Sequence, residues 1–326
     1  MITRRDVLTV SAAGVAFSAA GVVQRAVAQV PAKTVHILTG FTPGLQDAMA
    51  RLIAGQMNGY AETIVVEPRP GAAGRVAIEA VKTAAADGTV ILFAPLGFMM
   101  LFPHVYKTLK YAPQDFTPVS TVASSPTLLT VGPKIPGDVK TLADFVAWCR
   151  ANPKHATYGT AGVGTTLHFL GAMLGRTANF AFLHVPYQGN GSTQDLLKGE
   201  IASTVMPIGS SLGQIRSGDL RALATTGPRR SPFLPDVPTV KEAGYPALED
   251  LIWYGFFVPA KTPANIVEKL NAAIQGALRT DEVKSGLERL SVEPDAIAMS
   301  DFARLIASES DRWKAIVQAT GFVPTD

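Results

Sequence analysis

Short β-branched and aromatic runs alternate with helix-like segments through most of this 326-residue chain, and this alternation constrains the fold more than any other feature. We predict strands at residues 35–38, 64–67 and 89–93, separated by helices at 47–57 and 75–83. Strands and helices that alternate in this way form βαβ units, which build mainly parallel sheets. The chain is therefore expected to be an α/β protein.

The same alternation begins again at residue 128 and continues to residue 225, and an apolar strand follows at Trp253–Val258. The remainder of the chain has helical periodicity without further strands, with apolar residues every four positions between Ile266 and Leu278. Helices without strands must cover an existing sheet. Chains of about 300 residues usually divide into two domains or form one large one, and we interpret this chain as two α/β lobes.

The first 28 residues resemble an export signal rather than part of a folded domain. Arg4-Arg5 precede a mildly apolar stretch, and Ala26-Val27-Ala28 matches the small-x-small pattern that signal peptidases cleave. The apolar stretch is short and weakly hydrophobic for a membrane span, which needs about 20 strongly apolar residues. We predict a twin-arginine signal at residues 1–28, cleaved near Ala28, with a Sec signal as the alternative.

Charged residues are scarce, at 17% of the chain against about 25% in an average soluble domain. The basic residues form no cluster, so we expect no nucleic-acid partner. The single cysteine, Cys149, and the scattered histidines have no metal-ligand spacing, so no metal site is expected. The chain also has no nucleotide-binding fingerprint, and we predict no cofactor.

Two glycine-bearing loops, each between a predicted strand and a predicted helix, are the candidate ligand site. They are Phe41-Thr42-Pro43-Gly44-Leu45-Gln46-Asp47 and Thr160-Ala161-Gly162-Val163-Gly164-Thr165-Thr166, and neither contains Lys or Arg. In open α/β sheets, ligands bind at the carboxyl ends of strands, where helix N-termini present free N–H groups. The loops could hold an anion from two sides. Alternatively, the glycines serve tight turns, and Asp47, Thr165 and Thr166 only cap helices.

A different kind of site is suggested by Gly209-Ser210-Ser211-Leu212-Gly213, which matches the G-x-S-x-G pattern of a hydrolase nucleophile. The usual chain order of that fold places the catalytic histidine after the serine. All five histidines precede Ser211 here. An exported serine hydrolase therefore stays an alternative, and an ordinary Gly/Ser turn is the simpler interpretation.

Several segments follow one another in the order of a known family. They include Gly40-Phe41-Thr42-Pro43-Gly44, Arg69-Pro70-Gly71-Ala72, Ala86-Asp87-Gly88, Tyr158-Gly159-Thr160-Ala161-Gly162 and Leu234-Pro235-Asp236-Val237-Pro238. With these segments the chain resembles the Bug family, the solute receptors of tripartite tricarboxylate transporters. The resemblance covers essentially the whole mature chain.

This resemblance implies a periplasmic receptor with the two-lobed, Venus-flytrap fold of periplasmic binding proteins. Residues 29–130 and 255–326 would form lobe 1, and residues 131–254 would form lobe 2. The lobes would close on a small organic carboxylate and present it to membrane permease subunits, without catalysis. We expect a monomer. A ligand sensor that docks on a signalling partner would share the same cleft and stays open as an alternative.

Carried over residue by residue, the family's cleft corresponds to loop, helix-start and strand-end positions of both lobes: Phe41, Gly44, Leu45, Gln46, Asp47, Leu96, Gly162, Val163, Gly164, Thr165, Thr166 and Met206. The family loop usually reads Pro-Gly-Gly, whereas Leu45 follows Gly44 here, and many relatives carry an acid where we align Met206. Both differences make the cleft less polar. We therefore expect an aromatic or otherwise partly apolar carboxylate as the ligand.

Overall fold

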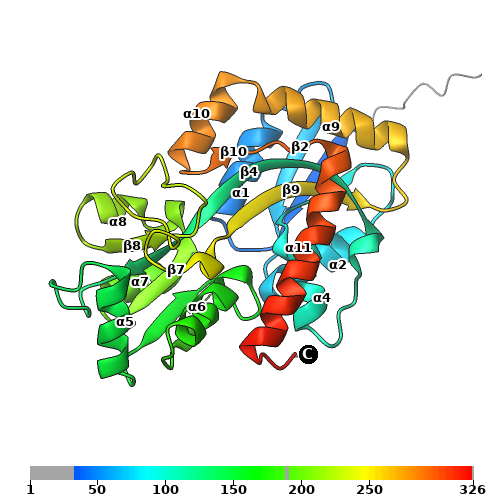
Figure 1. The fold of residues 1–326 in the computed structure, drawn as a ribbon. Coiled ribbons are helices and arrows are strands. Elements are labelled where there is room, and N and C mark those ends of the chain that lie inside the picture. Colours follow the sequence, from blue (N-terminus) through cyan, green and yellow to red (C-terminus); the bar gives the residue numbers. More distant parts are fainter. Residues whose placement is uncertain (1–32, 188–190, 325–326) are drawn as a thin grey trace, which may run out of the picture.

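The computed structural model describes residues 33–187 and 191–324, and the predicted export signal lies outside these ranges. Figure 1 shows two α/β lobes beside each other, with the long strands β4 (Phe116–Val131) and β9 (Leu251–Pro259) in the region that joins them. Within the described ranges, no helix combines the length and hydropathy that a membrane crossing requires.

The strands form one continuous sheet with the main order β2-β1-β3-β9-β4-β7-β5-β6, and β8 and β10 pair with β4. The remaining strands have these bounds: β1 (Thr34–Thr39), β2 (Thr63–Pro68), β3 (Val90–Pro95), β5 (Thr157–Thr160), β6 (Leu183–Pro186), β7 (Ser203–Pro207), β8 (Arg221–Thr225) and β10 (Glu293–Pro294). We call the part built on β1, β2, β3, β9 and β10 lobe 1, and the part built on β5 to β8 lobe 2.

The predicted parallel pairs are present in both lobes. Strand β1 runs parallel to β2 and β3, and β5 runs parallel to β6 and β7. Every antiparallel pair in the described sheet involves β4 or β9, so the sheet as a whole is mixed. The expected two-lobed α/β fold is confirmed, and the antiparallel pairs arise because the two strands that join the lobes run against each other.

Strand β4 changes partners along its length. Its first part, Phe116–Pro126, pairs with β9, and its last part, from Thr127 to Val131, pairs with β7 and β8. One strand therefore belongs to the sheet of lobe 1 at its start and to the sheet of lobe 2 at its end. The predicted lobe boundaries at residues 130 and 254 lie within β4 and β9.

The helices cover both faces of the sheet (Figure 1), and their bounds are α1 (Leu45–Ala54), α2 (Arg75–Lys82), α3 (Gly97–Met100), α4 (Phe102–Val105), α5 (Leu142–Ala151), α6 (Thr166–Thr177), α7 (Gly191–Leu197), α8 (Leu212–Arg216), α9 (Ala264–Leu278), α10 (Asp281–Arg289) and α11 (Met299–Thr320). Local sequence sets several of their ends. Thr141 and Asp144 form a reciprocal capping box at the start of α5, and Gly321, with φ of 69°, ends α11 in the left-handed region.

The last helix, α11, links the two lobes. Phe302 is buried near its start and packs against Phe257 of β9 at a ring-centroid distance of 5.3 Å. Trp313, further along the helix, packs against Phe169 of α6 at 6.2 Å, and Phe322 lies 5.1 Å from the same ring. Figure 1 shows α11 running along lobe 1 and ending near α6. The contact with lobe 2 is a feature that the sequence did not predict.

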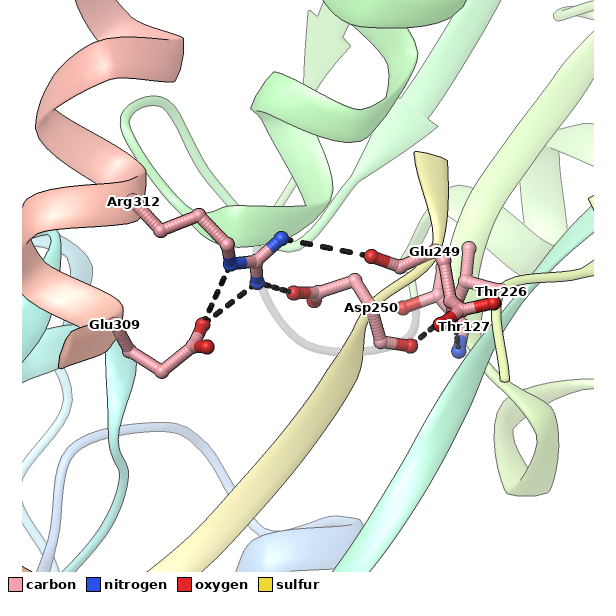
Figure 2. Close-up of polar contacts among 6 residues, drawn as sticks. All are labelled: Thr127, Thr226, Glu249, Asp250, Glu309 and Arg312. Atoms are coloured by element: carbon pink, nitrogen blue, oxygen red, sulfur yellow. Dashed lines mark hydrogen bonds and ion pairs between the residues drawn. The ribbon is translucent and has the colours of Figure 1, made fainter. Parts of the chain in front are cut away.

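A buried polar cluster lies just before β9, where the chain returns to lobe 1 (Figure 2). The Asp250 carboxylate, whose side chain is 0% exposed, is paired with Arg312 of α11, which also bonds Glu309. The backbone of Asp250 is held by Thr226, whose Oγ1 donates to the Asp250 carbonyl at 2.8 Å and accepts from the Thr127 N–H at 2.8 Å. The cluster therefore ties α11 to the region between the lobes.

Candidate ligand-binding site

A cavity of about 110 Å³ lies between the two lobes. Its walls come from the β1–α1 loop and the β3–α3 region of lobe 1, from the start of α6 and the end of β7 in lobe 2, and from β9. The lining residues are Phe41, Thr42, Pro43, Gly44, Leu45, Gln46, Pro95, Gly97, Phe98, Phe102, Ala161, Thr165, Thr166, Leu167, Met206, Pro207, Ser210, Ile252 and Tyr254. None of these side chains carries a charge.

The β1–α1 loop brings the N-terminus of α1 to this cavity. The first helical hydrogen bond runs from the Ala48 N–H to the Gly44 carbonyl at 2.9 Å, so the N–H groups of the first turn are not used by the helix. Gly44 provides no side-chain cap. The Gln46 side chain is anchored by its Nε2, which donates to the Phe93 carbonyl at 2.5 Å, and its buried Oε1 has no partner among the described residues.

The facing wall is the N-terminus of α6. Thr165 caps this helix, because its Oγ1 accepts from the His168 N–H at 3.3 Å while donating to the Gly162 carbonyl at 2.9 Å. The next residue, Thr166, also lines the cavity, and its side chain is almost fully buried. The Thr165 hydroxyl therefore has both a donor and an acceptor partner within its own loop, as the capping interpretation predicts.

Two histidines contact the loop that precedes α6. The His168 Nδ1 accepts from the Gly164 N–H at 3.2 Å, and the His184 Nε2 lies 2.7 Å from the Thr160 hydroxyl. Their rings stack at a centroid distance of 4.1 Å. Burial lowers the pKa of His168 to about 4, and burial together with the neighbouring His168 lowers the pKa of His184 to about 3. Both imidazoles are therefore neutral at pH 7.

The remaining walls are mainly apolar. Met206 of β7 is buried and lines the cavity. Leu45, the residue after Gly44, also lines it. Phe41 and Phe98 pack at a centroid distance of 5.7 Å, and Phe98 lies 4.9 Å from Phe102. Away from the two helix N-termini, the cavity is therefore lined mainly by apolar side chains.

The structure brings most of the predicted site residues together, but not all of them. The predicted residues that line the cavity are Phe41, Gly44, Leu45, Gln46, Thr165, Thr166 and Met206. Asp47 lines neither this cavity nor its neighbour, because its carboxylate is paired with Arg51, with Nε 2.9 Å from Oδ2. Leu96 is fully buried in the core, and Gly164, with φ of 76°, packs near Val105 instead.

The other predicted residues, Gly162 and Val163, line a second cavity of about 480 Å³ that shares Phe41, Thr42 and Ala161 with the first. Arg75, the first residue of α2, also lines this second cavity. Sequence reasoning missed Arg75, because it considered cations only within the two glycine-bearing loops. The available signal was its position directly after Pro70-Gly71-Ala72-Ala73-Gly74, which is another strand-to-helix connection.

Ser211, the serine of the hydrolase pattern, lines neither cavity, although the preceding Ser210 lines the first one. Ser211 is 1% exposed, and its Oγ has no hydrogen-bond partner in the described part of the chain. In residues 33–187 and 191–324, no group of His, Cys, Asp and Glu side chains is arranged to hold a metal ion. The inter-lobe cavities are therefore the candidate site.

Two α/β lobes, joined by long strands and separated by an inter-lobe cavity, define a periplasmic-binding-protein fold. The chain belongs to the tripartite tricarboxylate transporter receptor family, because the family model matches residues 49–322. This match confirms the resemblance seen in the sequence, and Protein BugT of Bordetella pertussis agrees with it, at 34% identity over 301 residues that cover 89% of this chain and 90% of BugT. The UPF0065 protein in the tcbD-tcbE intergenic region of Pseudomonas sp. strain P51 is 33% identical over 294 residues, covering 88% of this chain and 86% of that protein.

Solved structures agree with this assignment. Rpa4515 of R. palustris with adipate has a TM-score of 0.83 and 30% identity, over 89% of this chain and 98% of that chain. MatC (Rpa3494) from Rhodopseudomonas palustris with bound malate has a TM-score of 0.81 and 30% identity, and the match covers 87% of this chain and 98% of MatC. The periplasmic binding protein BugD has a TM-score of 0.82 and 27% identity, and the match covers 90% of this chain and 99% of BugD. The chain therefore has the fold of a solute-binding receptor.

Proposed function

We propose that this protein binds a small carboxylate with an apolar body between its lobes and presents it, in the closed form, to the permease subunits of a tripartite transporter in the membrane. The predicted export signal at residues 1–28 would deliver it to the periplasm as a monomer. Residues 29–130 and 255–326 would form one lobe, and residues 131–254 the other. Adipate and malate in the similar R. palustris proteins support a carboxylate ligand.

One observation supports the proposal most strongly: two helix N-termini, one from each lobe, border a cavity whose other walls are uncharged and mainly apolar. The positive end of each helix favours an anion, and the unused N–H groups of the α1 turn can donate to it. Burying a carboxylate requires such hydrogen bonds to replace its lost hydration. Leu45 and Met206 would contact the apolar part of the ligand rather than its charge.

No catalytic role is proposed for Ser211. A nucleophilic serine needs a general base within hydrogen-bond reach, and the Ser211 Oγ has no partner among the described residues. Ser211→Ala is expected to leave ligand binding unchanged. Esterase activity in the wild-type protein that disappears in this variant would instead favour the hydrolase alternative.

The proposal can be tested by a thermal-shift screen of carboxylates on the purified protein. A ligand that binds only the native state raises the melting temperature according to its concentration and affinity. Adipate, hexanoate and benzoate are expected to raise the melting temperature, and citrate is expected to have a smaller effect. A large shift with citrate and none with the partly apolar acids would overturn the proposed ligand class.

A further inference from the structure

The second inter-lobe cavity contains a cation that the first cavity lacks. Its walls come from the turn before α2, from Tyr106 after α4, and from the Gly162-Val163 segment and Tyr187 of lobe 2. Arg75 is the one charged side chain among the described residues that line it. A ligand in this cavity would therefore meet a positive charge.

The guanidinium of Arg75 is held in place without being neutralised. Its Nε donates to the Ala72 carbonyl at 3.0 Å, and its Cζ lies 3.9 Å from the centroid of the Tyr106 ring. Its terminal nitrogens have no partner in the described part of the chain. Glu79, one turn further along α2, is instead 3.9 Å from Lys110. Burial raises the pKa of the Tyr106 phenol, which therefore stays neutral and does not balance the charge.

The backbone that presents Arg75 adopts an uncommon conformation. Gly71, Ala72, Ala73 and Gly74 all have positive φ, with values of 138°, 47°, 55° and 95°. Positive φ is sterically disfavoured for alanine, and such strain is concentrated at functional sites. This left-handed turn ends at Gly74, and α2 begins at the next residue, Arg75.

The cavity also depends on both lobes. The Tyr106 hydroxyl donates to the Val163 carbonyl at 3.2 Å, so the ring beneath Arg75 is bonded to the glycine loop of lobe 2. Phe41, Thr42 and Ala161 line this cavity and the apolar cavity alike. An elongated ligand that passes these shared residues would contact Arg75 at one end and the N-terminus of α6 at the other.

The geometry points to a second carboxylate-binding subsite, formed by Arg75, and hence to an elongated dicarboxylate as the ligand. This inference rests on the proposed function and deepens it. One carboxylate lies between the helix N-termini of α1 and α6, the chain passes Phe41, Thr42 and Ala161, which both cavities share, and the second carboxylate accepts from Arg75. A guanidinium with free terminal nitrogens matches the two oxygens of a carboxylate, which a neutral ligand group would not do.

The test compares adipate with hexanoate, which has the same six-carbon chain and one carboxylate fewer. Isothermal titration is carried out on the wild-type protein, on Arg75→Gln and on Arg69→Gln. Arg69 is a matched control, because it lies six residues earlier, lines neither cavity and is paired with Glu67, with Nη2 3.1 Å from Oε2. Melting temperatures without ligand are measured for all three proteins to verify that both variants fold.

We expect the wild-type protein to bind adipate more tightly than hexanoate. Arg75→Gln should weaken adipate binding about tenfold or more, as expected for a lost charge-assisted pair, and leave hexanoate binding unchanged. Arg69→Gln should behave as the wild-type protein.

Two contrary results have different meanings. If hexanoate binds the wild-type protein as tightly as adipate, and Arg75→Gln changes neither affinity, the assignment of a carboxylate-binding subsite to Arg75 is wrong. The proposed carboxylate receptor then still stands. If neither acid binds the wild-type protein, the proposed function and the subsite both fail.

Discussion

Met206 bears directly on the ligand class that we propose. Its buried thioether lines the apolar cavity between the lobes. A carboxylate there could order water or meet an amino group, whereas a thioether can only contact apolar surface. The expected preference for an apolar ligand body therefore depends on this side chain and on Leu45.

Met206→Glu is expected to weaken adipate binding by more than about tenfold. A second carboxylate within a few ångströms of the ligand repels it, and two like charges 4 Å apart interact with about 4 kcal/mol at an effective dielectric constant of 20. Titration calorimetry measures the change. Met206→Leu keeps the volume and the apolar surface and should bind adipate like the wild-type protein. Equal affinities for the Glu and Leu variants would show that residue 206 does not face the ligand.

His168 acts at the same scale but through the backbone. Its neutral Nδ1 accepts the Gly164 N–H, so it positions the loop that precedes α6. His168→Phe would leave that N–H without its acceptor and should lower the free energy of unfolding by about 1–3 kcal/mol, with weaker hexanoate binding. His168→Asn supplies a carbonyl oxygen in its place and should restore much of both. Urea unfolding and calorimetry give the two readouts, and identical losses in both variants would contradict the role of this hydrogen bond.

The sequence predicted the cavity-lining residues where they lie in a loop between a strand and a helix. Phe41, Gly44, Thr165 and Thr166 follow from that position alone, because helix N-termini meet at the carboxyl ends of parallel strands. Asp47 satisfies the same rule, yet it pairs with Arg51 one helical turn further on, and spacing alone does not decide between a ligand and an ion pair. Arg75 reaches the cleft through a left-handed turn whose geometry has no periodic signature.

At the scale of elements, the strands that join the lobes were the hardest part to predict. Parallel strands such as β1 and β5 stand out as short apolar runs between helices. Strand β4 is different, because its 16 residues include Pro118 and Pro126 and belong to two environments. Its pairing with β9, β7 and β8 is set by contacts between residues far apart in the chain. Local pattern therefore predicted the end of β4 and not its first half.

The contact between Arg312 of α11 and Asp250, just before β9, leads us to expect that the stability of the protein depends on pH. Burial raises the pKa of Asp250 to about 7, against the opposing effect of Arg312, and its Oδ2 has no partner among the described residues. The carboxyl of an unfolded chain titrates near 3.9. The folded protein therefore holds this proton more tightly, and the stability that it contributes is fully present below about pH 4 and is lost as the pH rises through 7.

We expect the free energy of unfolding of the wild-type protein to fall relative to that of Asp250→Asn between pH 4 and pH 8. The amide cannot ionise, so it lacks this pH dependence. Urea unfolding of both proteins at several pH values provides the comparison (Figure 2 shows the contacts involved). A constant difference across this range would mean that Asp250 is ionised throughout.

At the scale of the whole molecule, the two lobes are connected by β4, β9 and α11, and each lobe contributes one helix N-terminus to the cavity. Both helix ends can contact one anion only when the lobes are together. A ligand shifts a conformational equilibrium only through its differential affinity for the two states. Under the proposed function, ligand binding is therefore expected to shift the lobes towards the closed form.

Small-angle X-ray scattering of the purified protein should show a smaller radius of gyration with saturating adipate than without it. The decrease reflects the larger population of the closed form. Met206→Glu at the same adipate concentration provides a control, because its weaker binding leaves more of the open form. A radius of gyration that is independent of adipate, under conditions where calorimetry shows full binding, would contradict ligand-linked closure.

Calorimetric titration of the wild-type protein decides whether the inter-lobe cavity binds a carboxylate with an apolar body, as we propose. Adipate, benzoate and citrate are titrated under one set of conditions. We expect adipate or benzoate to bind at least about tenfold more tightly than citrate, a difference of about 1.4 kcal/mol in binding free energy. Tight binding of citrate, with no heat from either partly apolar acid, would contradict it.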